Sequence, residues 1–248
     1  MVRNTQSLHP PSIRVMTWNI HGGVGPDRRL DLQRVVDLIR RHQPQIVALQ
    51  EIDSRGRPVS SPDPFDFLGE KLGGNVFASR AIRTAEGDYG HALISCWPMA
   101  AAQSHDISYK RREPRIAIEA VVETPYAPLQ VVAAHLGLSL RERLYQAEKL
   151  LQILHRGKDR SVLLGDLNDW IGRSKVRRVL NGHFPDHTHF RTFPAVRPIL
   201  SLDRIYCHPR SMLHRSRTDR EARFASDHLP VIADLVLQDA RELSGVSF

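Results

Sequence analysis

Five short apolar runs, each next to a cluster of polar side chains, place the strongest constraint on how this 248-residue chain can fold. Runs such as residues 46–49 and 162–164 are continuously apolar instead of alternating, so both of their faces must be covered. We therefore expect these strands at the centre of a sheet. The adjoining polar clusters are Thr17-Trp18-Asn19, Gln50-Glu51, His135, Gly165-Asp166-Leu167-Asn168-Asp169 and Ser226-Asp227-His228. Because a strand end holds side chains rigidly, these clusters predict one site assembled from distant segments.

Helical patterns are interleaved with strand patterns along the chain. Residues 31–42 place apolar side chains on one face and arginines on the other, which predicts an amphipathic helix. Ser139 can cap a second helix that runs to about His155, with Glu142 completing a capping box. Leu140 is expected among its inward residues. Other strands are expected at 75–80, 91–97, 115–123, 129–134, 202–207 and 231–237, and short helices at 65–72 and 175–180. Two stacked sheets with helices on their outer sides fit this order.

No linker or low-complexity segment divides the chain. We expect a single domain over residues 13–238, between a flexible segment at 1–12 and a tail at 239–248. No apolar stretch reaches the ~18–20 residues that a membrane span needs, and no apolar signal region opens the sequence. We therefore expect a cytoplasmic protein, and a monomer. In a reducing compartment, Cys96 and Cys207 are expected to be buried free thiols.

The charge balance favours an anionic substrate. The chain has 35 basic and 27 acidic residues and a net charge of +8, and nearly all of the surplus is arginine. The planar guanidinium suits bidentate contacts with phosphate. The densest basic stretches are 110–115, 173–178 and 210–223, and each of them can face an anionic polymer or a membrane surface. The alternative is that they form ordinary solvated loops and helix faces.

The Gln50-Glu51 cluster offers a ligand for a divalent cation. Hydrolysis of a phosphodiester requires relief of charge on the non-bridging oxygens, and a hard ion such as Mg²⁺ or Mn²⁺, held by carboxylates, supplies it. Glu51 is the first candidate ligand because no basic residue follows it before Arg55. Asn19 can add a neutral oxygen ligand or orient Glu51. The alternative for Glu51 is a surface carboxylate at a strand end.

A second carboxylate lies in the sequence Gly165-Asp166-Leu167-Asn168. In an extended segment, Asp166 and Asn168 point to the same side, and Gly165 permits a close backbone approach. Such a pair can hold an ion, position a water molecule or assist the leaving group. An Asx-type turn is the structural alternative.

His228 is the candidate general base. Its second ring nitrogen should donate to a carboxylate that fixes the tautomer. Asp227 is its neighbour, but adjacent residues on a strand point to opposite faces, so Asp203 is the better partner. His135 is expected to contact a phosphate oxygen. With 13 histidines in the chain, position at a strand end is what separates these two from the others.

In order along the chain, these motifs resemble the endonuclease/exonuclease/phosphatase superfamily, which includes deoxyribonuclease I, exonuclease III-type enzymes, sphingomyelinases and inositol polyphosphate 5-phosphatases. The resemblance rests on Thr17-Trp18-Asn19-Ile20-His21, Leu49-Gln50-Glu51, His135-Leu136, Gly165-Asp166-Leu167-Asn168, Leu202-Asp203 and Ser226-Asp227-His228-Leu229-Pro230. It implies a four-layer α/β/β/α sandwich, with two stacked mixed sheets, and Mg²⁺- or Mn²⁺-dependent cleavage of phosphate esters.

The resemblance also implies roles for individual residues. Asn19 and Glu51 would lie at the metal, Asp166 and Asn168 at the phosphate, and Asp227 near a second cation position, while Asp203 would orient His228. Within the superfamily the chain is similar to small bacterial metal-dependent hydrolases, on motifs that include Tyr89-Gly90-His91 and Glu113-Pro114-Arg115. We expect Arg115 and His91 to contact substrate. His91 replaces the Asn or Glu of relatives, so the group that supports His135 is expected to be another imidazole.

Three substrate classes compete. A nuclease is favoured by the arginine surplus, although the loops after His135 and Asn168 are short for gripping a duplex. Cleavage of phospholipid head groups, as in sphingomyelinases, would need an exposed apolar loop, for which Phe184, Phe190 and Phe193 are candidates, with core packing as the alternative. A phosphomonoesterase is third. A scaffold without activity would have lost Glu51, Asp166 or His228, and all three are present.

Overall fold

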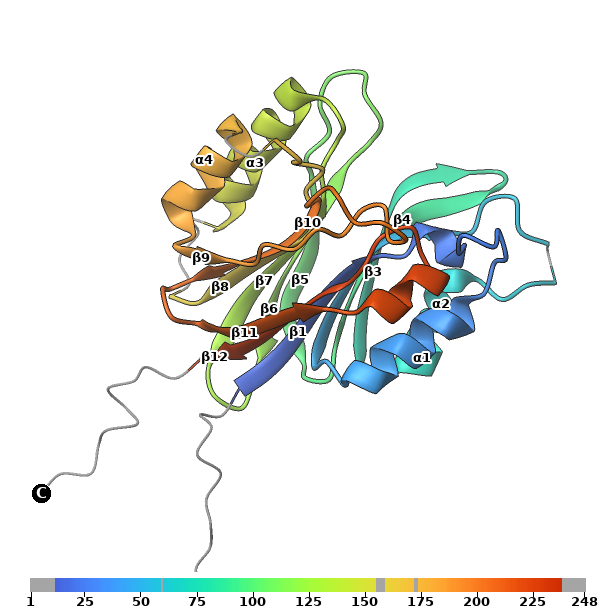
Figure 1. The fold of residues 1–248 in the computed structure, drawn as a ribbon, viewed down its shortest axis with the longest axis horizontal. Helices are drawn as coiled ribbons and strands as arrows, with labels where there is room; N and C mark the ends of the chain where they lie inside the picture. The colour runs from blue at the N-terminus through green and yellow to red at the C-terminus, as the bar shows by residue number, and fades with distance from the viewer. Residues whose placement is uncertain (1–11, 59, 155–158, 172–173, 238–248) are drawn as a thin grey trace, which may run out of the picture.

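The computed structural model describes residues 12–58, 60–154, 159–171 and 174–237. Two six-stranded sheets are stacked face to face, and helices cover their outer sides (Figure 1). This arrangement confirms the predicted four-layer sandwich. Among the described residues, no helix has the length and hydrophobicity to cross a bilayer.

The first sheet has the strand order β11-β12-β1-β2-β4-β3, and the second has the order β5-β6-β7-β8-β10-β9. The strands of the first sheet are β1 (Ser12–Asn19), β2 (Ile46–Asp53), β3 (Asn75–Thr84), β4 (Gly87–Ser95), β11 (Leu213–Thr218) and β12 (Val231–Val236). Those of the second are β5 (Met99–Asp106), β6 (Ile116–Glu123), β7 (Pro128–His135), β8 (Ser161–Asp166), β9 (Asp186–His187) and β10 (Asp203–His208). The helices are α1 (Leu32–His42), α2 (Pro64–Leu72), α3 (Leu140–Leu154) and α4 (Lys175–His183), with 3-10 turns η1 (His21–Gly23) and η2 (Arg220–Phe224).

Each sheet contains one parallel pair of strands joined by a helix. In the first sheet the β1-α1-β2 unit pairs Asn19 with Gln50, and in the second the β7-α3-β8 unit pairs His135 with Asp166. Parallel strands bring their carboxyl ends to the same edge of a sheet, which is where an open α/β sheet binds ligands. The predicted polar clusters therefore meet at one end of the sandwich.

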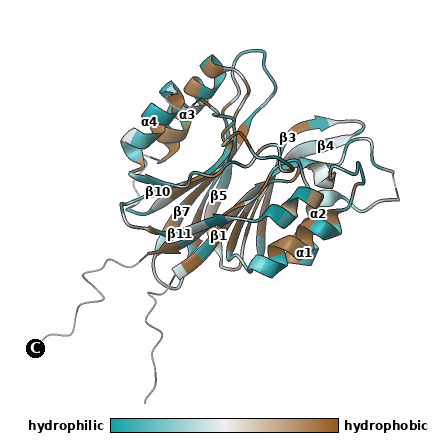
Figure 2. Cartoon of the chain, in the orientation of Figure 1, coloured by the Kyte–Doolittle hydropathy of each residue, from teal (hydrophilic) through white to brown (hydrophobic). Residues whose placement is uncertain are grey.

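Three apolar layers hold the sandwich together, and Figure 2 shows their hydrophobic residues on the strands and on the inward faces of the helices. The run at residues 46–49 illustrates the packing. Ile46 and Ala48 lie in the core between the two sheets, whereas Val47 and Leu49 lie in the core beneath α1 and α2. The run is thus covered on both faces, as its composition predicts. A third core lies beneath α3 and α4.

The predicted helix starts are formed by side-chain caps. Asp31 accepts hydrogen bonds from the backbone N–H groups of Gln33 and Arg34 at the start of α1. At the start of α3, Ser139 Oγ accepts from Glu142 N (3.3 Å) and the Glu142 carboxylate accepts from Ser139 N (3.5 Å), which confirms the capping box. The prediction that Leu140 faces inward is wrong, because its side chain is exposed on the first turn.

Several other expectations differ from the structure. The edge strands β5 and β11 were not predicted, because β5 mixes apolar and polar residues and β11 falls in a basic stretch. Cys207 is a buried free thiol, but Cys96 is exposed at the end of the β4 region. The predicted flexible segment and tail lie outside the described residues, except for Ser12, which begins β1.

The phenylalanines that were considered for an exposed apolar loop are packed instead. Phe184 is buried in the core beneath α3 and α4, and Phe190 packs against the core between the sheets. The Phe193 ring lies 4.9 Å from the His228 ring. Core packing, the alternative for this cluster, therefore holds for Phe184 and Phe190, whereas Phe193 is half-buried at the site.

Candidate active site

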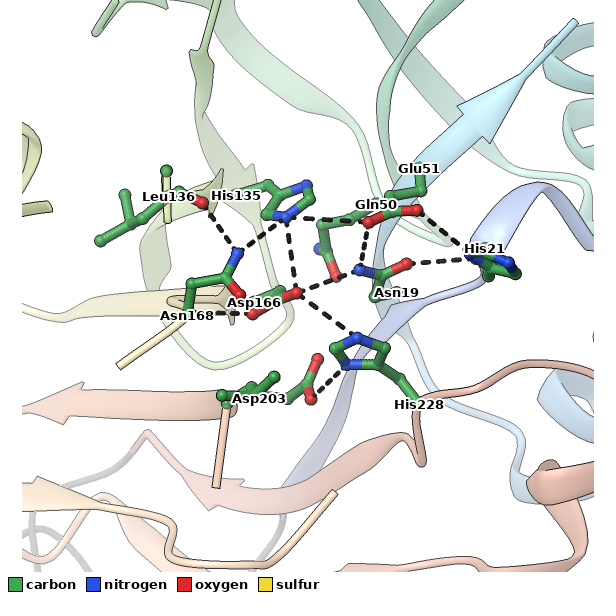
Figure 3. Close-up of polar contacts among 12 residues, drawn as sticks. Asn19, His21, Gln50, Glu51, His135, Leu136, Asp166, Asn168, Asp203 and His228 are labelled. Carbon is green, nitrogen blue, oxygen red and sulfur yellow. Dashed lines mark hydrogen bonds and ion pairs between the residues drawn. The ribbon is translucent and has the colours of Figure 1, made fainter. Parts of the chain in front are cut away.

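The polar side chains of both sheets converge at the strand ends (Figure 3). Asn19 joins the two sheets, because its Nδ2 donates to Glu51 Oε1 at 2.8 Å and to Asp166 Oδ2 at 3.0 Å. The side-chain oxygen of Asn19, Oδ1, accepts a hydrogen bond from His21 N at 3.1 Å. These contacts match one of the two roles predicted for Asn19, namely the orientation of Glu51.

Glu51 reaches the site through an irregularity of β2. Between the pairs Leu49–Ala92 and Ile52–Gly90, two residues of β2 face the single residue His91 of β4. Glu51 has a φ of 58°, in the left-handed region, and such a bulge re-aims a side chain. Burial disfavours the charged form of Glu51, but hydrogen bonds from His21 and Asn19 outweigh it and lower the pKa of this carboxyl. Glu51 is therefore an ionised carboxylate.

His228 and Asp203 form the predicted pair, with His228 Nδ1 2.9 Å from Asp203 Oδ2. The backbone around His228 is fixed by two further contacts: Trp18 Nε1 donates to His228 O at 2.9 Å, and His228 N donates to Ser226 Oγ at 3.1 Å. Burial opposes the charged form of His228, but the charge and hydrogen bond of Asp203, together with Asp166, raise its pKa to about 10. The Nε2 atom faces Asp166 Oδ2 at 3.8 Å.

Asp166 lies at the centre of the cluster and is fully buried. Burial, and then the charge of Asp203, raise its pKa to about 7. Asn168 is not extended but has a φ of 49°, and its N–H donates to Asp166 Oδ1 at 2.9 Å. The Asx turn is thus present, and it is part of the site. The close approach expected at Gly165 is confirmed, since a Cβ there would lie 1.8 Å from Ala134 O.

The hydrogen bond that supports His135 comes from Arg115, whereas the predicted imidazole, His91, contacts the His135 ring without a hydrogen bond. Arg115 Nη1 lies 3.0 Å from His135 Nδ1. Because a guanidinium can only donate, Nδ1 accepts and Nε2 carries the proton, directed toward Asp166 Oδ2 at 3.4 Å. Burial, and then the charge of Arg115, lower the pKa of His135 well below its usual value. His135 is therefore a neutral donor.

His91 and Arg115, expected to contact substrate, both lie next to His135. Both are buried, and Arg115 lies behind His135 with its Nη2 2.8 Å from Glu113 Oε1. The His91 ring meets the His135 ring edge to face at 5.8 Å. Neither nitrogen of His91 has a hydrogen-bond partner in the described part of the chain, and burial lowers its pKa to about 3.

His21 is a residue of the site that sequence reasoning missed. Its Nδ1 lies 3.6 Å from Glu51 Oε2 and 3.8 Å from Asp227 Oδ2, so it lies between these two carboxylates. The hydrogen bond with Glu51 raises the pKa of His21. Asp227, expected near a second cation position, is thus next to His21 and is not the partner of His228. The sequence does place His21 two residues after Asn19, just beyond the end of the same strand, which could have indicated that it lies at the site.

The carboxylates at the site fit a hard divalent cation. Carboxylate oxygens of Glu51 and Asp166 lie within 4.8 Å of each other, as do those of Asp166 and Asp203. The buried Asp203 Oδ1 has no hydrogen-bond partner among the described residues. The Glu51 side chain is 24% exposed and borders a cavity of about 400 Å³ lined also by Tyr89. Oxygen donors with solvent access are what Mg²⁺ and Mn²⁺ prefer.

Comparisons with known proteins agree with this geometry. Residues 16–228 match the endonuclease/exonuclease/phosphatase family. The chain is 30% identical over 246 residues to "Uncharacterized protein YbhP" of Escherichia coli, covering 91% of this chain and 97% of YbhP.

Solved structures share the fold. An endonuclease/exonuclease/phosphatase from Bacteroides vulgatus is 18% identical, with a TM-score of 0.74 over 92% of this chain and all of its own. A mannosyl-6-phosphatase from Bacteroides thetaiotaomicron is 17% identical, with a TM-score of 0.69 over 91% of this chain and all of its own.

Proposed function

This chain belongs to the endonuclease/exonuclease/phosphatase family, whose members are phosphoric ester hydrolases, and from that premise we propose that it is a divalent-metal-dependent phosphodiester hydrolase. The observation that carries the proposal is the His228–Asp203 pair, at 2.9 Å, beside the carboxylates of Glu51 and Asp166. A tethered imidazole next to a cluster of acidic oxygen ligands suits attack by water on a phosphorus centre.

Each side chain has a distinct part in this reaction. The pKa of His228 would be lowered from its metal-free value by a divalent cation on the neighbouring carboxylates. In its neutral form, His228 Nε2 accepts the proton of the attacking water, while Asp203 holds Nδ1 and stabilises the imidazolium that results. As the new P–O bond forms, the ester P–O bond opposite it breaks. His135 Nε2 and Asn168 Nδ2 lie 3.1 Å apart, and one Nδ2–H of Asn168 donates to Leu136 O at 2.9 Å. With Nε2 protonated, His135 Nε2–H and the second Nδ2–H of Asn168 can both donate to a non-bridging oxygen.

The departing oxygen needs a proton or an electrophile. Asp166, whose pKa is raised to about 7, can carry the proton at neutral pH and donate it to the leaving oxygen. Mg²⁺ or Mn²⁺, when bound, supplies charge relief for the phosphoryl oxygens, and Glu51 is the residue that would hold it. Asn19 keeps Glu51 and Asp166 at a fixed separation.

Turnover of bis(p-nitrophenyl) phosphate with Mg²⁺ or Mn²⁺ tests the proposal. His228→Ala and Glu51→Ala should each lower the rate at least ~10²-fold, and EDTA should abolish it. His42→Ala is the matched control, because His42 is bonded to Asp219 at 2.8 Å outside the site. Wild-type rates in both site variants, or no EDTA-sensitive turnover on any phosphodiester, would show that the proposal is wrong.

A further inference from the structure

One rim of the site exposes large apolar side chains. Leu138 is 66% exposed, Leu140 42%, Trp170 44% and Ile171 42%. They lie just after the strand ends that carry His135 and Asp166, at the start of α3 and in the loop after β8. Arg143 connects the two groups, because its guanidinium donates to Leu138 O and lies 4.6 Å from the centre of the Trp170 ring. The segment before α3 and the loop after β8 therefore lie side by side.

A basic depression adjoins this apolar rim. The loop between β5 and β6 rises beside the start of α3 (Figure 1), and together they form a hollow of about 460 Å³. Its cationic lining residues are Lys110, Arg111, Arg112 and Arg141. Within the part of the chain that the structure describes, these four form no ion pair with an acidic side chain. The hollow also includes Ser139, which separates the exposed Leu138 from Leu140.

Each aromatic ring on this face contacts a neighbouring cation or another ring. Arg143 lies over Trp170, Lys110 lies 5.2 Å from the Tyr109 ring centre, and Tyr109 packs against Tyr145 at 5.3 Å. Single-stranded nucleic acids bind by stacking bases on open aromatic rings. Exposed aliphatic side chains beside unpaired cations instead match the interface of an anionic bilayer, where apolar groups enter the acyl boundary and cations meet the head groups.

We propose that this surface, defined by Lys110, Arg111, Arg112, Leu138, Leu140, Arg141, Trp170 and Ile171, docks the enzyme on anionic phospholipid membranes. The inference rests on the proposed function and gives it a substrate class, namely the head-group phosphodiester of a membrane phospholipid. One water adds to phosphorus as one ester P–O bond breaks, and the products are an alcohol and a phosphate monoester. The docked surface places this diester beside His135 and Asp166.

Binding is measured first, in EDTA, with no turnover. The protein carries Trp97→Phe, so that the remaining tryptophans are the buried Trp18 and the exposed Trp170. Vesicles of phosphatidylcholine with 30% phosphatidylglycerol should bind the protein, and brominated acyl chains should quench Trp170 fluorescence. Vesicles of phosphatidylcholine alone should bind at least ~10-fold more weakly.

Two double variants separate this surface from general charge. Arg111→Glu with Arg112→Glu should weaken binding to the anionic vesicles at least ~10-fold. Arg210→Glu with Arg215→Glu, two exposed arginines in the turn after β10 and in β11, changes the net charge equally and should change binding less than ~3-fold. Leu138→Ser with Leu140→Ser should also weaken binding and remove the quenching.

Activity distinguishes failure of this inference from failure of the proposed function. The arginine and leucine variants of the surface should hydrolyse soluble bis(p-nitrophenyl) phosphate at the wild-type rate and lose at least ~10-fold on vesicle phospholipid. Wild-type vesicle binding by these variants would overturn the docking surface while the soluble assay still supports hydrolysis. Binding of single-stranded DNA or RNA through Arg111 and Arg112, without vesicle binding, would also overturn it.

Discussion

The β1-α1-β2 and β7-α3-β8 units share one topology, yet their terminal carboxylates meet different surroundings. Glu51, on β2, is 24% exposed, borders a cavity and has a lowered pKa. Asp166, on β8, is 1% exposed and has a pKa raised to about 7. Burial disfavours a charged carboxylate. In the more open β1-α1-β2 unit, Glu51 therefore stays ionised and accessible to a cation from solvent. The closed unit keeps a carboxyl that can hold a proton.

The largest expected effect comes from exchanging these two carboxylates for amides. Glu51→Gln should lower turnover at least ~10²-fold and shift the half-maximal Mg²⁺ concentration upward, because it removes an ionised ligand. Asp166→Asn should lower kcat by a similar factor with a smaller shift in Mg²⁺ requirement. Metal titrations of turnover measure both. A larger metal shift in Asp166→Asn would reverse the assignment of the two units.

Asp203→Asn should have the next largest effect, about 10- to 100-fold on kcat, because the amide cannot stabilise the His228 imidazolium. In metal-free protein it should also lower the pKa of His228 from about 10, as followed by NMR titration. Because the pKa of His228 is higher in the folded protein than in the unfolded chain, where it is near 6.5, protonated His228 stabilises the folded state. This contribution to the free energy of unfolding is complete below about pH 6.5 and is lost as the pH rises through about 10. Asp203→Asn should therefore flatten the stability curve between these pH values. An unchanged curve would contradict the pairing.

Arg115→Gln should lower kcat about 10-fold, because His135 Nδ1 would lose its charged donor and the fixed Nε2–H tautomer. Arg115→Lys should recover part of this loss, since an ammonium also only donates. The ¹⁵N chemical shifts of the His135 ring report the tautomer directly. If the His135 ring keeps its proton on Nε2 in Arg115→Gln, Arg115 does not determine the tautomer.

The smallest expected effect is on stability, when the side-chain caps at the starts of α1 and α3 are removed. Asp31→Ala and Ser139→Ala should each lower the free energy of unfolding by about 1 kcal/mol, because each removes a side-chain acceptor for backbone N–H groups. Denaturant titration measures this loss. Turnover of a soluble diester should stay at the wild-type level, and a large loss in Ser139→Ala would mean that the start of α3 also orients His135.

The parts of the site that could be predicted depend on local patterns. Continuous apolar runs fixed the central strands, and the ends of those runs located Asn19, Glu51 and Asp166. The choice of Asp203 over Asp227 for His228 followed from strand alternation and is confirmed. The hydrogen bond between Arg115 and His135 was not predicted, because it depends on how β6 and β7 pair side by side, which no local pattern records.

The edge strands β5 and β11 and the turn at His21 were not predicted, for a different reason. The strands β5 and β11 each pair on one side only, so their composition is not restricted to apolar residues. The role of His21 depends on a turn with a φ of 47°, which carries its ring back toward Glu51. Such backbone choices are made by tertiary packing, and residue type predicts them weakly.

The extra residue in β2 has a consequence for how this scaffold can be altered. Leu49 and Ile52, three positions apart, both pack beneath the α1 and α2 helices, whereas a regular strand repeats every two positions. Deleting either residue between them would restore that spacing and a regular pairing with β4, and it would remove the bulge that aims Glu51. The strand would then run past the site without the bend that re-aims its acidic side chain, so this insertion ties the fold to its chemistry.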